Sequence, residues 1–134
     1  MNIKNLQKIA HTLAVEKGFW SKICPHCKGA SKKWKGGTCP ECFCNPLYGK
    51  KRNLSELLML IVSELGEACE ALRSGKRQHA VGFNWEKDTF EDELADAIIR
   101  ICDLAESEGI DLQWQIKKKL EYNKSRPEKH GKEF

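Results

Sequence analysis

Two pairs of carboxylates stand three residues apart in segments whose apolar spacing is helical: Glu64 with Glu67, and Glu93 with Asp96. Residues three apart on a helix share one face, so each pair directs two anionic oxygen ligands to the same side. If the two helices pack with these faces opposed, the four carboxylates enclose a space suited to Mg²⁺ or Mn²⁺, cations that prefer oxygen ligands. A solvated acidic face is the alternative that the same spacing permits.

A second set of residues has the spacing of a zinc site. Five of the seven cysteines fall within residues 24–44, where two Cys-x-x-Cys pairs place four thiolates within reach of one tetrahedral ion. The predicted Zn²⁺ ligands are Cys24, Cys27, Cys39 and Cys42, although Cys44 or His26 could replace one of them. A pair of disulfides is the other interpretation, and it would require an oxidising compartment.

The segment between the two cysteine pairs, residues 28–37, has too little apolar content to fold alone, so metal binding should supply the folding free energy of an insert over residues 19–52. We therefore expect a small four-cysteine zinc-binding insert between the first and second helices. The insert is basic and carries Trp34, so it could contact nucleic acid through phosphates and stacking. A purely structural insert explains the same residues.

A third set lies near the C-terminus. Lys119 and Asn123 share a helical face, Pro127 prevents the helix from continuing, and Arg126 and Lys129 add cations beyond it. A basic tail beside an acidic metal cluster has the charge arrangement of a polyphosphate site. A frayed, solvated terminus is the alternative.

The elements that must position these residues are helices. Apolar residues recur at helical steps after residue 3, after Asn53, after Asp88 and after Asp111, and the last three residues are suitable N-caps. Glycines or a serine end the four segments: Gly18, Gly75, Gly109 and Ser125. The sequence predicts an all-α, four-helix-bundle-like fold in one domain, residues 1–134, with Cys69 and Cys102 as buried thiols and with close helix approach at Gly66.

The charge is divided along the chain. Residues 1–52 carry 11 basic and 2 acidic side chains, residues 53–111 carry 5 and 14, and residues 112–134 carry 7 and 3. An acidic centre between basic flanks is a poor fit to a uniformly basic nucleic-acid binder and a better fit to a site that gathers metal ions and phosphates. No apolar stretch approaches the roughly 20 residues of a membrane span, so we expect a soluble, cytoplasmic protein.

Together these residues resemble the MazG-like nucleoside triphosphate pyrophosphohydrolases of the all-α NTP pyrophosphatase superfamily. Ser63-Glu64-Leu65-Gly66-Glu67-Ala68 and Glu93-Leu94-Ala95-Asp96 look like the E-x-x-E and E-x-x-D metal motifs of that family. Lys119, Asn123, Arg126-Pro127 and Lys129-His130-Gly131 are similar to its closing substrate-binding segment. The resemblance is good over residues 54–134 and weak over residues 1–18, and the zinc-type insert departs from it.

The resemblance implies a MazG-type fold and a function. Glu64, Glu67, Glu93 and Asp96 would hold Mg²⁺ or Mn²⁺ on the triphosphate of a (d)NTP, which is hydrolysed to (d)NMP and pyrophosphate. Lys119, Arg126 and Lys129 would neutralise phosphates, Asn123 would orient the sugar or base, and His130 belongs to the same segment. Family members form dimers or tetramers, which agrees with apolar faces too long for one monomer to bury.

Substrate choice is open at this level. The four tryptophans favour a purine deoxynucleotide such as dGTP or dATP, since each can stack on a base. A related pyrophosphatase acting on dUTP or phosphoribosyl-ATP is an alternative. So is a zinc-ribbon nucleic-acid-binding module without catalysis, which leaves the four carboxylates unexplained.

Overall fold

The computed structural model describes residues 1–20, 52–78 and 84–127, and these ranges contain four α-helices and no β-strand. The helices are α1 (Ile3–Glu16), α2 (Leu54–Arg73), α3 (Phe90–Ser107) and α4 (Leu112–Lys124). The prediction of an all-α fold is confirmed for these ranges. Within the same ranges, no helix combines the length and apolar character needed to cross a membrane.

The helix ends follow local capping chemistry. Asn53 accepts a hydrogen bond from the Ser55 amide at 3.0 Å, and Asp111 accepts one from the Trp114 amide at 2.9 Å, as their positions in the sequence predict.

The cap of α3 was predicted one residue too early. Thr89 is the N-cap and its hydroxyl accepts from the Asp92 amide, while Asp88 stands in the left-handed region with φ 60°. The Asp88 amide donates to the Asp92 carboxylate at 3.0 Å. Asp88 therefore belongs to the turn before the helix.

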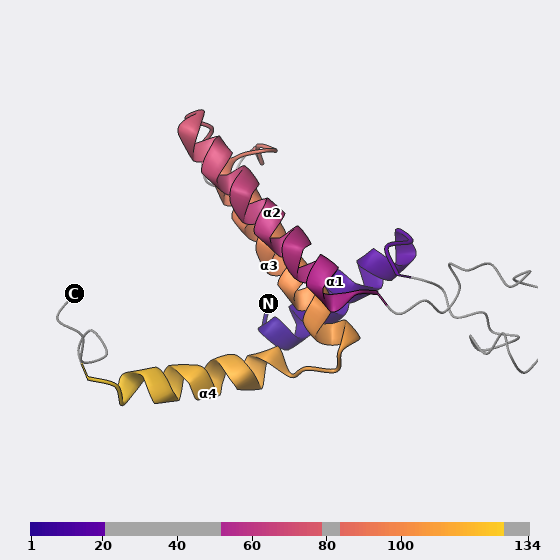
Figure 1. Ribbon diagram of the computed structural model, residues 1–134, viewed down its shortest axis with the longest axis vertical. Coiled ribbons are helices and arrows are strands. Elements are labelled where there is room, and N and C mark those ends of the chain that lie inside the picture. The colour runs from indigo at the N-terminus through magenta and orange to yellow at the C-terminus, as the bar shows by residue number, and fades with distance from the viewer. Residues whose placement is uncertain (21–51, 79–83, 128–134) are drawn as a thin grey trace, which may run out of the picture.

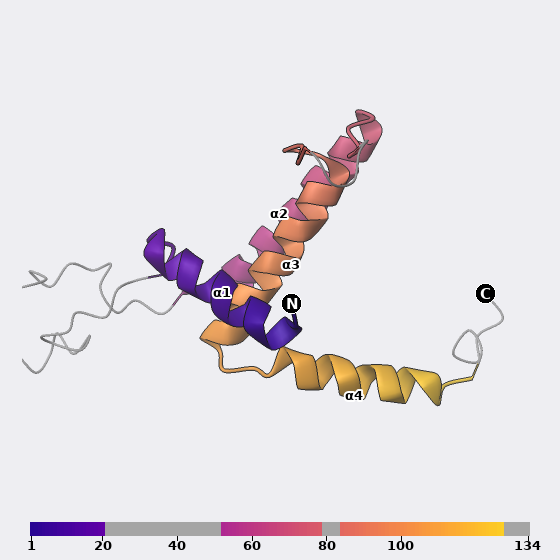
Figure 2. The same ribbon diagram turned by 180° about the vertical axis from the view of Figure 1, so that it is seen from behind.

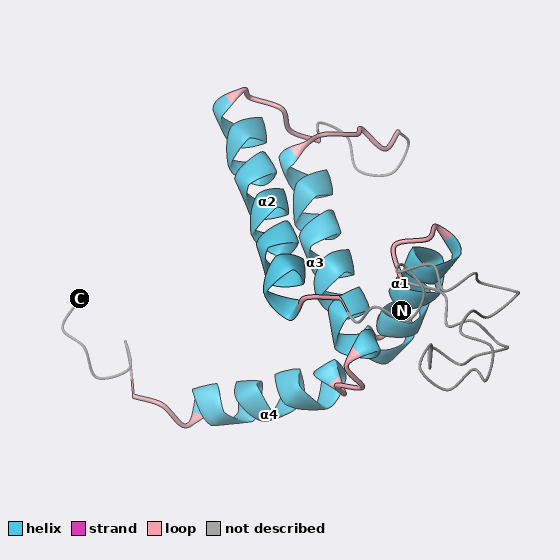
Figure 3. Ribbon diagram, turned by 45° about the vertical axis from the view of Figure 1, so that its right-hand side comes forward, coloured by secondary structure: helices cyan, strands magenta, loops and turns pink. Residues whose placement is uncertain are grey.

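Two helices form the body of the molecule and a third crosses it. α2 and α3 run antiparallel, side by side, as a hairpin, and α1 packs across α3 near the end at which α2 begins (Figures 1 and 2). We call this end the base of the hairpin and the end at which α2 stops and α3 begins its tip. α4 leaves the base and extends away from the hairpin (Figure 3).

Small side chains fill the core of this arrangement. The buried apolar residues come from three helices and are mostly alanines, with one cysteine and two larger aliphatic residues: Ala10, Leu57, Ile61, Ala68, Ala71, Ala97, Cys102 and Ala105. Of the apolar positions at helical spacing on α3, Ala105 belongs to this core, whereas Leu94, Ile98 and Ile101 are exposed. Alanines let the helices approach closely, and the larger aliphatic residues are left on the outside.

Two further expectations about the core were wrong. Cys102 is buried, at 1% exposed, but Cys69 is exposed on α2. Gly66 does not mark a close helix contact among the described residues, since a Cβ built there would meet nothing within 4 Å. Both residues lie on the side of α2 turned away from the core.

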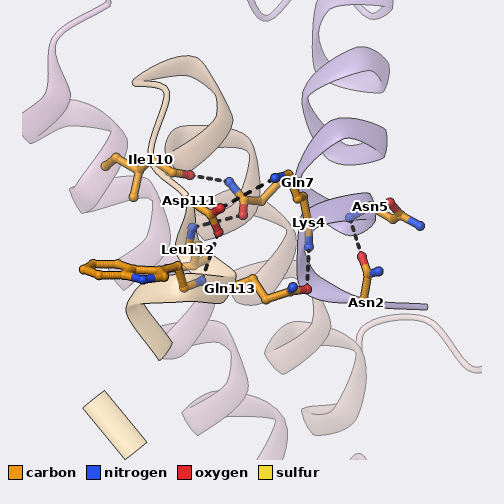
Figure 4. Close-up of polar contacts among 9 residues, drawn as sticks. Asn2, Lys4, Asn5, Gln7, Ile110, Asp111, Leu112 and Gln113 are labelled. Carbon is orange, nitrogen blue, oxygen red and sulfur yellow. Dashed lines mark hydrogen bonds and ion pairs between the residues drawn. The ribbon is translucent and has the colours of Figure 1, made fainter. Parts of the chain in front are cut away.

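A buried glutamine ties α1 to the turn between α3 and α4. The side-chain amide of Gln7, 2% exposed, donates to the Ile110 carbonyl at 2.7 Å and accepts from the Leu112 amide at 3.2 Å (Figure 4). Lys4 adds an ion pair with Asp111 at 3.6 Å. These contacts satisfy backbone groups at the start of α4 and fix the direction in which that helix leaves.

Beyond this turn, α4 is open to solvent in the part of the chain that the structure describes. None of its 13 residues, all of which are described, is buried. The sequence led us to expect a four-helix bundle. α4 does not complete one with α1, α2 and α3 of the same chain. Its apolar side chains, among them Trp114, Ile116 and Leu120, are exposed.

Several predicted features lie outside the described residues. These are the zinc ligands Cys24, Cys27, Cys39 and Cys42 with their competitors Cys44 and His26, and the substrate residues Lys129 and His130. Of the 19–52 insert, the structure describes Phe19, Trp20 and Arg52. The guanidinium of Arg52 lies over the Trp20 ring, 5.4 Å from its centroid, so the two ends of the insert meet.

Candidate functional site

Three of the four predicted carboxylates converge on the hairpin. Glu64 and Glu67 on α2 and Glu93 on α3 each offer an oxygen, and these oxygens lie within 4.8 Å of one another. Glu64 and Glu93 are buried, at 5% and 6% exposed, whereas Glu67 is exposed. We call these residues the carboxylate triad. Asp96, the fourth predicted residue, is exposed one turn further along α3 and is not in this group.

The triad concentrates negative charge. Burial is the largest influence on Glu93 and raises its pKa above the ordinary value, and the nearby carboxylates of Glu67 and Glu64 raise it further. The pKa of Asp96 is also raised, chiefly by burial and then by Asp92 and Glu64, while Arg100 opposes the shift. Both shifts disfavour the ionised carboxylates, chiefly through burial and then through the neighbouring negative charges.

The triad fits a hard divalent cation. With Mg–O distances of about 2.1 Å, ligand oxygens around one ion stand roughly 3 to 4 Å apart, so oxygens within 4.8 Å need only a small closing movement. Carboxylates are also the donors that Mg²⁺ and Mn²⁺ prefer. Glu64, Glu67 and Glu93 are thus the residues that could hold such an ion, with Asp96 one turn away.

An arginine contacts the triad directly. The Arg100 Nε donates to the Glu64 Oε1 at 2.5 Å. The Glu64 side chain is 7% exposed, whereas that of Arg100 is 42% exposed. A largely buried carboxylate is therefore neutralised by a cation that remains accessible to solvent.

A pocket opens next to this ion pair, between α1 and the base of the hairpin. It has a volume of about 550 Å³, which is in the range of small-molecule sites. Its walls are mostly aliphatic, with two carboxylates and three cations among them: Asp96, Asp103, Lys17, Arg52 and Arg100. Asp96 and Arg100 thus stand between the triad and the pocket.

One carboxylate of the pocket lining, Asp103, is held by two aromatic side chains. Asp103 accepts from the Trp20 indole at 2.8 and 2.9 Å and contacts the His11 Nδ1 at 2.7 Å. An ionised carboxylate can only accept, so this contact requires the proton of His11 on Nδ1. The His11 and Trp20 rings meet edge to face, 5.1 Å apart. Phe19, Asp103 and Arg52, which lies over Trp20, line the pocket, whereas His11 and Trp20 hold Asp103 from outside that lining.

Sequence reasoning missed His11, Arg100 and Asp103. A signal for two of them was present, because Asp96, Arg100 and Asp103 stand at steps of four and three and so share one face of α3. The contacts of His11 and Trp20 with Asp103 join residues that are 92 and 83 positions apart. Such contacts follow from how α1 crosses α3, which local spacing does not define.

The predicted phosphate-binding residues of α4 form a separate group. Lys119 and Arg126 both lie over the Tyr122 ring, at 5.0 and 5.7 Å from its centroid, and Asn123 is exposed. α4 points away from the hairpin in every view (Figures 1 to 3). The structure therefore does not bring Lys119, Asn123 and Arg126 to the triad of the same chain.

A second acidic group at the tip is less suited to a metal. Oxygens of Asp88, Asp92 and Glu93 also approach one another, but Asp88 pairs with Lys87 at 2.8 Å and Asp92 accepts from the Trp85 indole. The pairing with Lys87 lowers the pKa of Asp88. These acids have local partners that account for them.

No protein-family model, curated protein or solved structure matches this chain.

Proposed function

We propose that this protein is a metal-dependent nucleoside triphosphate pyrophosphohydrolase, with the MazG-like enzymes as the family it resembles. The reaction takes one (d)NTP and one water and yields one (d)NMP and one pyrophosphate. The P–O bond between the α phosphorus and the α–β bridging oxygen breaks, and the water oxygen becomes part of the monophosphate.

The order of groups along the hairpin carries this proposal. The triad lies towards the tip, Asp96 and Arg100 follow on α3, and the pocket, with Phe19 and Asp103 in its lining, lies at the base. A nucleotide has the same order of chemistry: an anionic phosphate chain at one end and a flat, polar-edged base at the other. The triphosphate would lie at the triad and the nucleoside in the pocket.

The residues of the site each have a role in that arrangement. Glu64, Glu67, Glu93 and Asp96 would hold Mg²⁺ or Mn²⁺, which supplies Lewis acidity and offsets phosphate charge when bound. The aliphatic walls of the pocket would exclude water from the nucleoside. Asp103, oriented by His11 and Trp20, would accept hydrogen bonds from the base or sugar.

A homo-oligomer is part of the proposal. Lys119, Asn123 and Arg126 extend away from the triad of their own chain, and α4 has no buried residue. The hairpin in turn exposes Leu58, Val62 and Leu65 on α2 and Leu94, Ile98 and Ile101 on α3. A second copy could cover these side chains and complete a helical bundle, bringing its α4 cations to the phosphates.

The zinc site stays a proposal from the sequence. The four cysteines Cys24, Cys27, Cys39 and Cys42 would hold one structural Zn²⁺ per chain, which metal analysis of protein purified without chelators would detect. A nucleic-acid-binding module is the competing function for the insert. It predicts a steep dependence of binding on salt concentration in a gel-shift assay.

A substrate panel tests the enzyme. Purified protein is incubated with the eight canonical NTPs and dNTPs, with dUTP and with phosphoribosyl-ATP, in Mg²⁺, in Mn²⁺ and in chelator. The proposal expects pyrophosphate from at least one nucleotide and none in chelator. Turnover of phosphoribosyl-ATP alone, or of dUTP alone, would favour one of the related pyrophosphatases.

A further inference from the structure

We propose that Arg100 links metal binding to nucleotide binding by exchanging partners. Without a divalent cation, Arg100 neutralises Glu64. When a cation takes Glu64, Arg100 turns into the adjoining pocket and binds a phosphate of the nucleotide. The inference rests on the function proposed above and assigns to that site a residue that the sequence motifs did not include.

The geometry puts one side chain at both places. Arg100 donates to Glu64, a member of the triad, and also lines the pocket between α1 and the hairpin. Lys17 and Arg52 line the same pocket. Of these three cations, Arg100 is the one that forms an ion pair with the triad in the described part of the chain.

The difference in burial decides which partner can move. Glu64 is held in the hairpin with its side chain 7% exposed, whereas Arg100 keeps 42% of its side chain exposed. A buried carboxylate without a cation is strongly disfavoured, so Glu64 needs one partner at all times. Arg100 can leave at little cost, provided that another cation replaces it.

The replacement is a competition for one carboxylate. Arg100 bonds Oε1 of Glu64, and Glu64 contributes to the group of oxygens that approach within 4.8 Å. An arginine and a divalent cation at the same carboxylate repel each other, so binding of the ion weakens the hold on Arg100. Once released, the planar guanidinium can direct two of its N–H donors to the oxygens of a phosphate.

The exchange predicts opposite effects from one substitution. Arg100→Met removes the competitor, so Mn²⁺ should bind the nucleotide-free protein about 3- to 10-fold more tightly. The same substitution removes a charged donor to phosphate. The α,β-methylene analogues of dATP and dTTP, at saturating Mn²⁺, should therefore bind about 10- to 100-fold more weakly. Titration calorimetry measures both affinities without turnover.

Two variants serve as references. Arg73→Met removes the same charge from α2, at an exposed pair with Glu70 outside the triad and the pocket, and should change neither affinity by more than about 2-fold. Arg100→Lys keeps a cation beside Glu64. It should leave Mn²⁺ affinity near wild type and weaken the analogues less than Arg100→Met does.

Thermal unfolding provides a readout that a simple structural role would not reproduce. Arg100→Met leaves Glu64 unpaired, so the melting temperature should fall in chelator. Mn²⁺ should then raise the melting temperature of this variant by more than it raises that of wild type, since the ion replaces the lost partner. A variant that stays destabilised in Mn²⁺ would count against the exchange.

The outcomes separate this inference from the proposed function. If wild type binds Mn²⁺ and the analogues, but Arg100→Met weakens both or changes neither, the exchange is wrong and the proposed function stands. If wild type binds no Mn²⁺, both are wrong. Tighter Mn²⁺ binding together with weaker analogue binding supports the exchange.

Discussion

Glu64 is the residue on which the site depends most. It is buried between the helices of the hairpin, it belongs to the triad, and it carries the ion pair with Arg100. A carboxylate in that position is costly to the fold unless a cation accompanies it. Its presence in the core is best explained by a function that requires it.

Substitution of the carboxylates should separate catalysis from folding. Glu64→Gln and Asp96→Asn should each lower metal-dependent pyrophosphate release by at least about 100-fold, since even residues that only support metal ligands contribute 10- to 100-fold. Circular dichroism should show unchanged helix content. Glu70→Gln, an exposed change on α2 outside the triad, is the matched control. Full activity in both variants would refute the assignment.

Glu93 makes a prediction about pH. Its pKa is raised in the fold, so the ionised side chain destabilises the metal-free protein above that raised pKa. The penalty declines as the pH falls through the folded value, and it is gone below the unfolded value near 4.5. In chelator, Glu93→Gln should therefore be more stable than wild type at pH 7.

The comparison of Glu93→Gln with wild type is made by denaturant unfolding between pH 7 and pH 4. The advantage of the variant should shrink across that interval. At pH 7, excess Mg²⁺ should reduce or reverse it, because the ion needs the wild-type carboxylate. An advantage that is constant with pH would show that charge at Glu93 is not the cause.

The carboxylate pattern was readable from the sequence because its spacing is local. Glu64 and Glu67 share a face of α2, as their spacing predicts. Glu93 meets them through the packing of α3 on α2, whereas Asp96, three residues from Glu93, does not join the group. Arg100 and His11 were not predicted, because their importance lies in contacts with Glu64 and Asp103, which lie on other helices. Side chains far apart in sequence meet only once the helix packing is known.

The ends of the helices could be predicted from the sequence, whereas the sides on which the helices pack could be predicted less well. Asn53 and Asp111 cap α2 and α4 through short-range hydrogen bonds that the sequence itself encodes. The core is different: α3 buries Ala97, Cys102 and Ala105 while larger aliphatic residues stay outside. Apolar spacing marks the sides of a helix that avoid water, but it does not tell which neighbour covers each side.

Gln7 joins α1 to the start of α4 through its hydrogen bonds with Ile110 and Leu112. We call these contacts the Gln7 clamp. Gln7→Ala would leave the Ile110 carbonyl and the Leu112 amide without their partner, and an unsatisfied buried group costs about 1–3 kcal/mol. The free energy of unfolding should therefore fall by about 2 kcal/mol, and amides at the start of α4 should exchange faster with solvent. Gln115→Ala, at an exposed position of α4, should change neither quantity. Equal stability of the two variants would contradict the role of the clamp.

At the scale of the whole molecule, one chain leaves much apolar surface uncovered. α2 and α3 expose many large aliphatic residues, among them Val62 and Ile98, and no residue of α4 is buried. The acidic hairpin and the lysine-rich α4 also have complementary charge. Both features favour assembly between copies.

A charge placed on the exposed hairpin surface tests that assembly. Wild type should sediment as a dimer or tetramer. Val62→Glu should shift the protein to monomer at the same concentration, because an unpaired carboxylate buried in an interface costs several kcal/mol. Lys8→Glu, at an exposed position of α1, is the control and should leave the assembly unchanged. A wild-type monomer at micromolar concentration would rule out the proposed oligomer.

Hydrolysis at the α phosphorus is tested by following the oxygen atom that water contributes to the products. The best nucleotide from the substrate panel is hydrolysed in H₂¹⁸O with Mg²⁺, and the products are analysed by mass spectrometry. We expect one ¹⁸O atom in the nucleoside monophosphate and unlabelled pyrophosphate, with neither product formed by Glu64→Gln. Release of orthophosphate, or no product from any nucleotide tested, would contradict the proposed function.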